Sequence, residues 1–222
     1  MLGVHEPKSH FASVLMSSLF AATGLSRPLS GLMMHTDNHS WVNTMRETTV
    51  SYRRMIDATI EQLTDDELFA RPAPAVNSVA IILRHLGGNL ISRWTDFLTT
   101  DGEKPDRNRD KEFQDWDGDR QTLISYFDSG WRALETAIES LDDNNIGNCI
   151  EIRGETHSIP QALTRSITHI TYHVGQIAIV ARQVHRGDWK WLTVAPGESS
   201  QFNKDTWGTS ASRSIFASDK DA

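Results

Sequence analysis

The chain has 222 residues, a formal net charge of −7 and 38% hydrophobic residues, so it can bury a sizeable core as one large or two small domains. The acidic balance argues against sequence-independent nucleic-acid binding, which depends on Lys and Arg neutralising phosphates. No run in the printed sequence approaches the 18 apolar residues that a membrane-spanning helix needs, so we expect no membrane partner.

Residues 1–36 differ in composition from the rest of the chain. Their apolar segment, 11–25, resembles a secretory h-region, but its flank mixes His5, Glu6 and Lys8, and no clean cleavage site follows. We interpret residues 1–36 as a disordered extension or as the result of a translation start placed too early. A signal peptide is the alternative; without one, the expected location is the cytoplasm.

A helical pattern begins near Ser40. Apolar residues recur every three to five positions as far as Ile60, as an amphipathic helix requires. The stretch 64–67 (Thr-Asp-Asp-Glu) is suited to capping a short helical turn, and the prolines in 71–74 then break the chain.

A second helix is predicted after Ser78, a good N-cap, and should run to about Leu98. It contains the pair Gly87-Gly88, and each glycine costs roughly 1 kcal/mol inside a helix. The pair therefore indicates a close helix–helix approach or room for a ligand. The charged stretch 101–117 is interpreted as a loop over the end of the bundle.

The stretch 119–142 carries one apolar stripe and predicts a third helix. A small β-hairpin follows between Asn148 and Ile159, turning at Gly154. Pro160 suits the first turn of a fourth helix, which should run to about Val184.

These elements predict an all-α fold, a four-helix bundle with a minor β-hairpin before the fourth helix. The bundle domain is expected to span residues 37–205. Residues 206–222 are interpreted as a polar tail.

Histidines offer the best candidate site. The single cysteine, Cys149, excludes a zinc site built from several thiolates, so a metal site must use His, Asp or Glu. His169 and His173 are four residues apart on the fourth predicted helix and therefore share a face. On a helical wheel both lie beside the apolar stripe, and His85 has the same position on the second helix.

Neutral imidazole nitrogens bind Zn²⁺, and an i,i+4 pair can hold one ion together with a third histidine from a neighbouring helix. The remaining position would then be open to water or substrate, as in catalytic sites. The same ligands accept Ni²⁺ or Fe²⁺, so the divalent metal is not fixed. The competing interpretation is a chance pair on the fourth helix and a hydrogen-bonded interior His85.

The stretches 77–90 (NSVAIILRHLGGNL) and 168–177 (THITYHVGQI) resemble the DinB/YfiT-like superfamily of metalloenzymes, over roughly residues 40–205. The resemblance implies a four-helix bundle of up-down-down-up topology, often a homodimer. It also implies a divalent metal on one histidine of the second helix and an HxxxH pair of the fourth. Those positions are His85, His169 and His173.

Neighbouring polar residues are candidates for substrate binding. Asn89 and Arg93 follow His85 by one and two turns, and Gln176 follows His173. Ordinary solvent-exposed side chains are the competing interpretation for all three. The remaining histidines singled out are interpreted as solvated: His35, His39, His157 and His185.

Three functions are compatible with these patterns. By resemblance, the metal would activate a low-molecular-weight thiol as thiolate for attack on a small electrophilic substrate, which would make the protein an S-transferase-like enzyme. A metal- or ligand-binding stress protein without turnover would use the same histidines. In a dimeric scaffold, the histidines would only pack.

Overall fold

The computed structural model describes residues 38–207, and it is mainly helical. The expectations for residues 1–36, including His35, and for the tail beyond residue 207 lie outside the described residues. The helices are α1 (Asn38–Ile60), α2 (Asp65–Phe69), α3 (Val79–Trp94), α4 (Arg120–Glu139), α5 (Ile159–Val184) and α6 (Ser199–Trp207). A short 3₁₀ helix, η1 (Asp110–Phe113), and an antiparallel hairpin, β1 (Cys149–Ile152) with β2 (Glu155–Ser158), complete the set.

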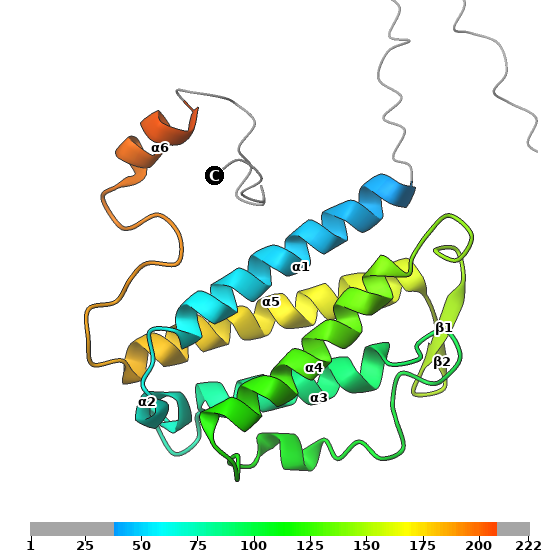
Figure 1. Ribbon diagram of the computed structural model, residues 1–222, viewed down its shortest axis with the longest axis horizontal. Helices are drawn as coiled ribbons and strands as arrows, with labels where there is room; N and C mark the ends of the chain where they lie inside the picture. Colours follow the sequence, from blue (N-terminus) through cyan, green and yellow to red (C-terminus); the bar gives the residue numbers. More distant parts are fainter. Residues whose placement is uncertain (1–37, 208–222) are drawn as a thin grey trace, which may run out of the picture. The chain divides into compact units, whose positions relative to one another are not determined.

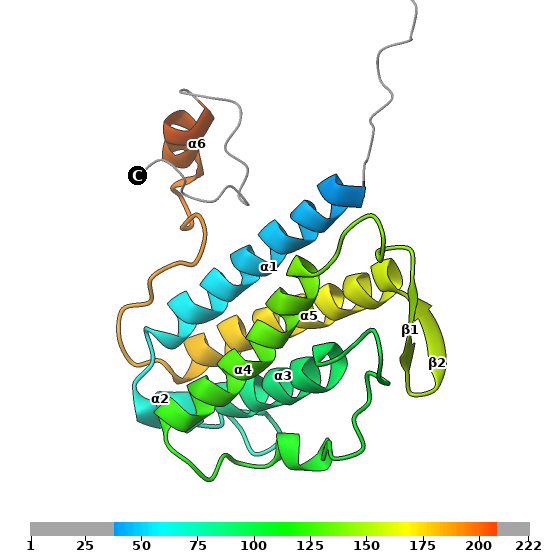
Figure 2. The same cartoon turned by 45° about the vertical axis from the view of Figure 1, so that its right-hand side comes forward.

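Four long helices form the predicted bundle. α1 lies beside α5, and α3 lies beside α4, in both views of the ribbon (Figures 1 and 2). α1 and α5 run in one direction and α3 and α4 in the other, which is the expected up-down-down-up topology (Figure 1). The hairpin immediately precedes α5, as predicted. No helix among residues 38–207 is long and apolar enough to cross a bilayer.

Side-chain caps fix the starts of the helices that matter for the site. The Ser78 hydroxyl accepts a hydrogen bond from the Ile81 amide and begins α3. Ser158 and Gln161 form a reciprocal capping box at the start of α5, where Pro160 occupies the first turn. These caps satisfy backbone donors that have no partner inside the helix.

α3 ends at Trp94 rather than near Leu98, so the predicted C-terminus was wrong. Asp96 adopts φ +48°, a left-handed conformation that terminates a helix, and the amides of Thr99 and Thr100 donate to its carbonyl oxygen. Phe97 nevertheless remains buried. It continues the apolar stripe from outside the helix.

Glycines allow the close approach of α3 and α4 that the Gly87-Gly88 pair predicted. A Cβ atom on Gly130 of α4 would overlap the Gly87 carbonyl oxygen and lie 2.8 Å from the Gly87 Cα. A Cβ atom on Gly88 would lie 2.5 Å from Glu112 Oε1. Backbone therefore packs directly against backbone at this crossing, and Glu112 can reach the surface of α3.

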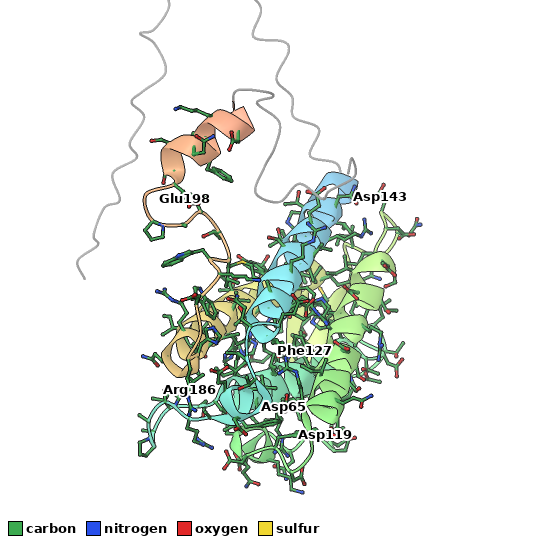
Figure 3. The ribbon with its side chains drawn as sticks, turned by 60° about the vertical axis from the view of Figure 1, so that its left-hand side comes forward. Asp65, Asp119, Phe127, Asp143, Arg186 and Glu198 are labelled. Atoms are coloured by element: carbon green, nitrogen blue, oxygen red, sulfur yellow. The ribbon has the colours of Figure 1, made fainter. Side chains whose placement is uncertain are left out.

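The core between the helices is apolar. Phe127 lies in it, whereas Asp65 and Asp119 lie together at one end of the bundle (Figure 3). Ile150 and Ile152 of β1 are buried while their neighbours are exposed, so one face of the hairpin closes the core.

The connection 95–119 is long because parallel helices cannot be joined by a short turn. It must return along the bundle, and it packs on α3 through η1, a helix that the sequence did not predict. Asp101 holds this connection to the hairpin, because its carboxylate accepts hydrogen bonds from the backbone amides of Arg153 and Gly154. α6 was not predicted either. None of its residues 199–205 is buried, and its Phe202 is exposed.

Candidate metal centre

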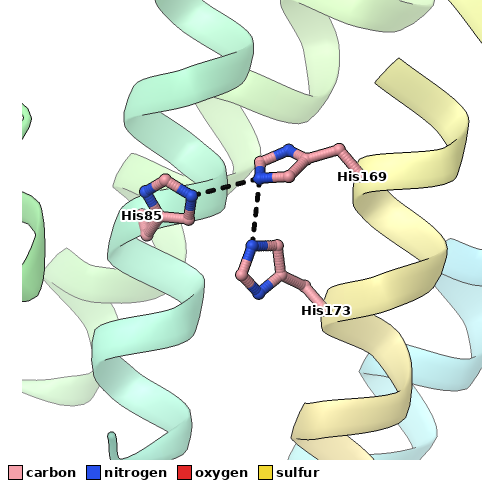
Figure 4. A group of neighbouring side chains, drawn as sticks. All are labelled: His85, His169 and His173. Carbon is pink, nitrogen blue, oxygen red and sulfur yellow. Dashed lines mark hydrogen bonds between the residues drawn. The ribbon is translucent and has the colours of Figure 1, made fainter. Parts of the chain in front are cut away.

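The three predicted ligands meet between α3 and α5. His169 Nε2 lies 3.2 Å from His85 Nε2 and 3.0 Å from His173 Nε2 (Figure 4). One ligand atom from each histidine lies within 4.8 Å of the others. His85 and His173 are buried, and His169 is partly buried. Two turns of α5 and one of α3 thus direct three imidazoles at a single point.

A carboxylate fixes the tautomer of His85. Its Nδ1 lies 2.8 Å from Glu112 Oε2, and an ionised carboxylate can only accept, so Nδ1 carries the proton. Arg107 donates to both Glu112 oxygens from Nε and Nη2. Burial by itself raises the Glu112 pKa, but the hydrogen bonds from His85 and Arg107 outweigh it and hold the pKa below its ordinary value. The lone pair of His85 Nε2 is therefore free to face His169 and His173, and these three residues are called the cluster below.

The side-chain amide of Gln176 fixes the tautomer of His173. Its Nδ1 donates to the Oε1 atom of Gln176 at 2.7 Å, one turn along α5. The Nε2 lone pair of His173 also faces the cluster. A carboxylate and an amide thus orient two of the three candidate ligands from outside.

Burial keeps the pair on α5 neutral. It lowers the pKa of His169 to about 3, and the neighbouring His173 and His85 lower it further. Burial followed by the neighbouring His85 lowers the pKa of His173 to about 4, with Gln176 opposing the change. Both imidazoles are unprotonated at neutral pH, which is the form that binds a metal.

The residues fit a divalent metal ion. Two nitrogens about 2.0–2.1 Å from one tetrahedral zinc ion are roughly 3.3 Å apart, close to the two separations at His169. Three imidazoles, two of them with a hydrogen-bonded outer nitrogen, are a typical donor set for Zn²⁺, and they also suit Ni²⁺ or Fe²⁺. A fourth position would stay open.

Comparison with known proteins adds a family. The model of DUF1572, a family described as proteins of unknown function, matches residues 36–198. The chain belongs to the DUF1572 family. A search of curated proteins gave no significant match. The family match therefore covers the whole bundle and all three histidines without naming a reaction.

In this DUF1572 protein a cavity of about 200 Å³ adjoins the cluster, and His85 and His169 form part of its wall. Asn89 and Arg93, both predicted to meet a substrate, also line it. Gln176 does not; its amide is engaged with His173. The other residues lining the cavity are Arg107, Arg109, Ile152, Arg153, Ala162, Arg165 and Ser166.

A second, open hollow of about 770 Å³ also has His169 in its wall. Trp41 of α1 and Pro160 and Tyr172 of α5 also line it, and its wall is mostly apolar. Arg165 and His169 line both spaces. His169 therefore borders one mostly polar and one mostly apolar space.

Sequence reasoning missed Glu112 and Arg107, which lie in the stretch that it interpreted as a plain loop. It also interpreted His157 and His185 as solvated, whereas both are partly buried. His185 lies 3.4 Å from Glu67, whose other carboxylate oxygen accepts the Arg186 amide. This contact ties the end of α5 to α2, away from the cluster.

Proposed function

We propose that this protein is a DinB/YfiT-like metalloprotein that binds one divalent ion through His85, His169 and His173. One observation carries the proposal: three imidazole Nε2 atoms converge, two of them with lone pairs set by Glu112 and Gln176. A packing role for the histidines would require neither the convergence nor the outer hydrogen bonds.

We further propose that the open position serves a thiol transferase-like reaction. A bound divalent ion would supply Lewis acidity that deprotonates a low-molecular-weight thiol at neutral pH. α3 and α5 would keep the three histidine ligands in place, and Arg107 holds the Glu112 carboxylate against His85. The two spaces bordering His169 offer separate places for the thiol and for its electrophile.

The resemblance also suggests a homodimer. Tyr172 and Ile179 of α5 are 63% and 61% exposed and lie seven residues apart, on one face of the helix. Sedimentation of the purified chain tests this expectation directly.

Metal analysis of protein purified without a histidine tag tests the site. We expect about one equivalent of metal in the natural chain and almost none in His169→Ala/His173→Ala. The matched control is His157→Ala/His185→Ala, which removes two histidines outside the cluster and should keep its metal. Equal metal content in all three proteins would overturn the proposed site.

A thiol assay tests the reaction. The metal-loaded protein is given a generic electrophile with glutathione, bacillithiol, mycothiol or cysteine, and loss of thiol is followed with time. We expect turnover with at least one thiol, lost in His169→Ala/His173→Ala and kept in the control variant. Metal binding without turnover with any thiol would reject the transferase and leave a binding protein.

A further inference from the structure

Five arginines line the 200 Å³ cavity beside the cluster, and they come from four different parts of the chain. Arg93 is on α3, Arg107 and Arg109 precede η1, Arg153 is in the hairpin turn, and Arg165 is on α5. Such a concentration of cations is unexpected in a protein of net charge −7. It needs a physical explanation, because like charges destabilise one another at close range.

The carboxylates at this cavity do not balance its arginines. The Glu103 carboxylate forms ion pairs with three of them, at 3.1 Å from Arg153, 3.2 Å from Arg107 and 3.7 Å from Arg93. Among the described residues, the one other acid at ion-pair distance from these arginines is Glu112, which is already engaged by Arg107 and His85. Within residues 38–207, neither Arg109 nor Arg165 has a carboxylate at ion-pair distance. The cavity therefore carries excess positive charge.

Of the five arginines, Arg93 most clearly needs a hydrogen-bond partner. Its side chain is only 10% exposed, and its buried Nη1 atom has no hydrogen-bond acceptor among the described residues. Burial lowers the pKa of Arg93 to about 10; Glu103 opposes this, and Arg107, Arg165 and Arg153 add to it. A buried guanidinium with an unused donor and cationic neighbours is stabilised when an anion enters.

Arg153 occupies an unfavourable backbone position. It and Gly154 form the two-residue turn of the hairpin, with φ +58° and +72°. Such turns favour Asn-Gly or Asp-Gly, because other side chains are strained at positive φ. Strain retained at one residue is typical of functional sites. Here the strained residue contributes a cation to the cavity wall.

We propose that this cavity binds the oxyanion group, carboxylate or phosphate, of a small-molecule substrate whose other end reaches the metal centre. Guanidinium groups bind both oxyanions with paired hydrogen bonds. A volume of about 200 Å³ suits the anionic end of a small molecule. The part of the substrate that reaches His85 and His169 rests on the proposed function. A thiol that carries carboxylates fits the site, and an uncharged thiol does not.

Isothermal titration calorimetry with inorganic phosphate and with succinate tests this inference on the full chain as purified. We expect at least one of them to bind. Arg165→Gln and Arg153→Asn should each weaken that binding by about tenfold, the effect of losing one charged hydrogen bond. Arg153→Asn is informative because Asn tolerates positive φ, so the turn is kept while the charge is removed. Arg132→Gln, an exposed arginine of α4 outside the cavity, is the matched control and should bind unchanged.

The two ligands separate the sources of the oxyanion. Binding of phosphate alone identifies a phosphate ester, binding of succinate alone a carboxylate, and binding of both a site for either group. Binding should persist in His173→Ala, which removes a proposed metal ligand that does not line the cavity and so separates this inference from the metal site. No binding of either ion, equal weakening in Arg132→Gln, or loss only in the histidine variant would overturn the proposal.

Discussion

His85 Nδ1 and Glu112 Oε2 lie 2.8 Å apart across 27 residues of sequence. The contact joins a buried helix to the connection that crosses it, and it sets the proton of the imidazole that faces α5. We expect Glu112→Ala to weaken zinc binding by about 10- to 100-fold, the usual effect of losing such a partner. Competition with a chromophoric chelator measures this change.

The matched control for Glu112 is Asp110→Asn, an exposed acid of the same 3₁₀ helix. It removes one negative charge nearby without touching a histidine, so zinc affinity should not change. Equal loss in the two variants would mean that total charge, and not the contact with His85, sets the affinity.

Gln176 should act on His173 in the same way. Gln176→Leu removes the acceptor at Nδ1, and we expect zinc affinity to fall by about tenfold. Gln176→Glu keeps an acceptor and should retain affinity. Gln183→Leu, an exposed glutamine further along α5, provides the control. An unchanged affinity in Gln176→Leu would show that His173 needs no support from this amide.

The metal-free protein should lose stability in acid. His169 and His173 have folded-state pKa values of about 3 and 4, below the ordinary value of 6.5, so the unfolded chain binds their protons first. The two neutral histidines contribute fully to the free energy of unfolding above about pH 6.5. This contribution is lost as the pH falls towards their folded-state pKa values, by at most roughly 1.4 kcal/mol per pH unit for each histidine. Urea unfolding at pH 7, 6 and 5 measures it.

The same titration of His169→Ala/His173→Ala serves as the comparison. That variant should show a shallower dependence between pH 6.5 and 5, because the two depressed groups are gone. Parallel curves would contradict the assignment of the acid sensitivity to this pair.

Two glycines should respond to alanine in opposite directions. Gly130→Ala places a methyl group against the Gly87 backbone, which cannot give way without moving α3 from α4, and we expect a loss of about 1–3 kcal/mol or more. Gly175→Ala meets nothing within 4 Å on α5 and should stabilise by about 0.5–1 kcal/mol. Thermal and urea unfolding of both variants, compared with the natural chain, provide the measurement. Similar effects would mean that the α3–α4 crossing is loose.

The bundle and the three histidines could be predicted because their signals are local. Each long helix carries its own apolar stripe, and Ser78 and Ser158 mark two of the starts. The spacing of His169 and His173 places them on one face whatever the rest of the chain does. The end of α3 was misjudged because Phe97 continues the apolar pattern after the helix has stopped.

The surroundings of the histidines could not be predicted, because they depend on the path of the chain. Glu112 lies in a stretch without periodicity, and nothing near it in sequence marks it as a partner of His85. Arg153 and Arg165 are exposed residues of a turn and a helix, and only the fold brings them to one cavity.

The parallel arrangement of α3 and α4 has one more consequence. A tight turn between antiparallel neighbours would have removed residues 95–119, and with them Glu112, Arg107 and Arg109. As built, the three histidines belong to α3 and α5, while Glu112, Arg107 and Arg109 beside them belong to a connection. Substitutions in that connection can therefore change the hydrogen bonding and the charge around the three histidines while the helices that carry them stay the same.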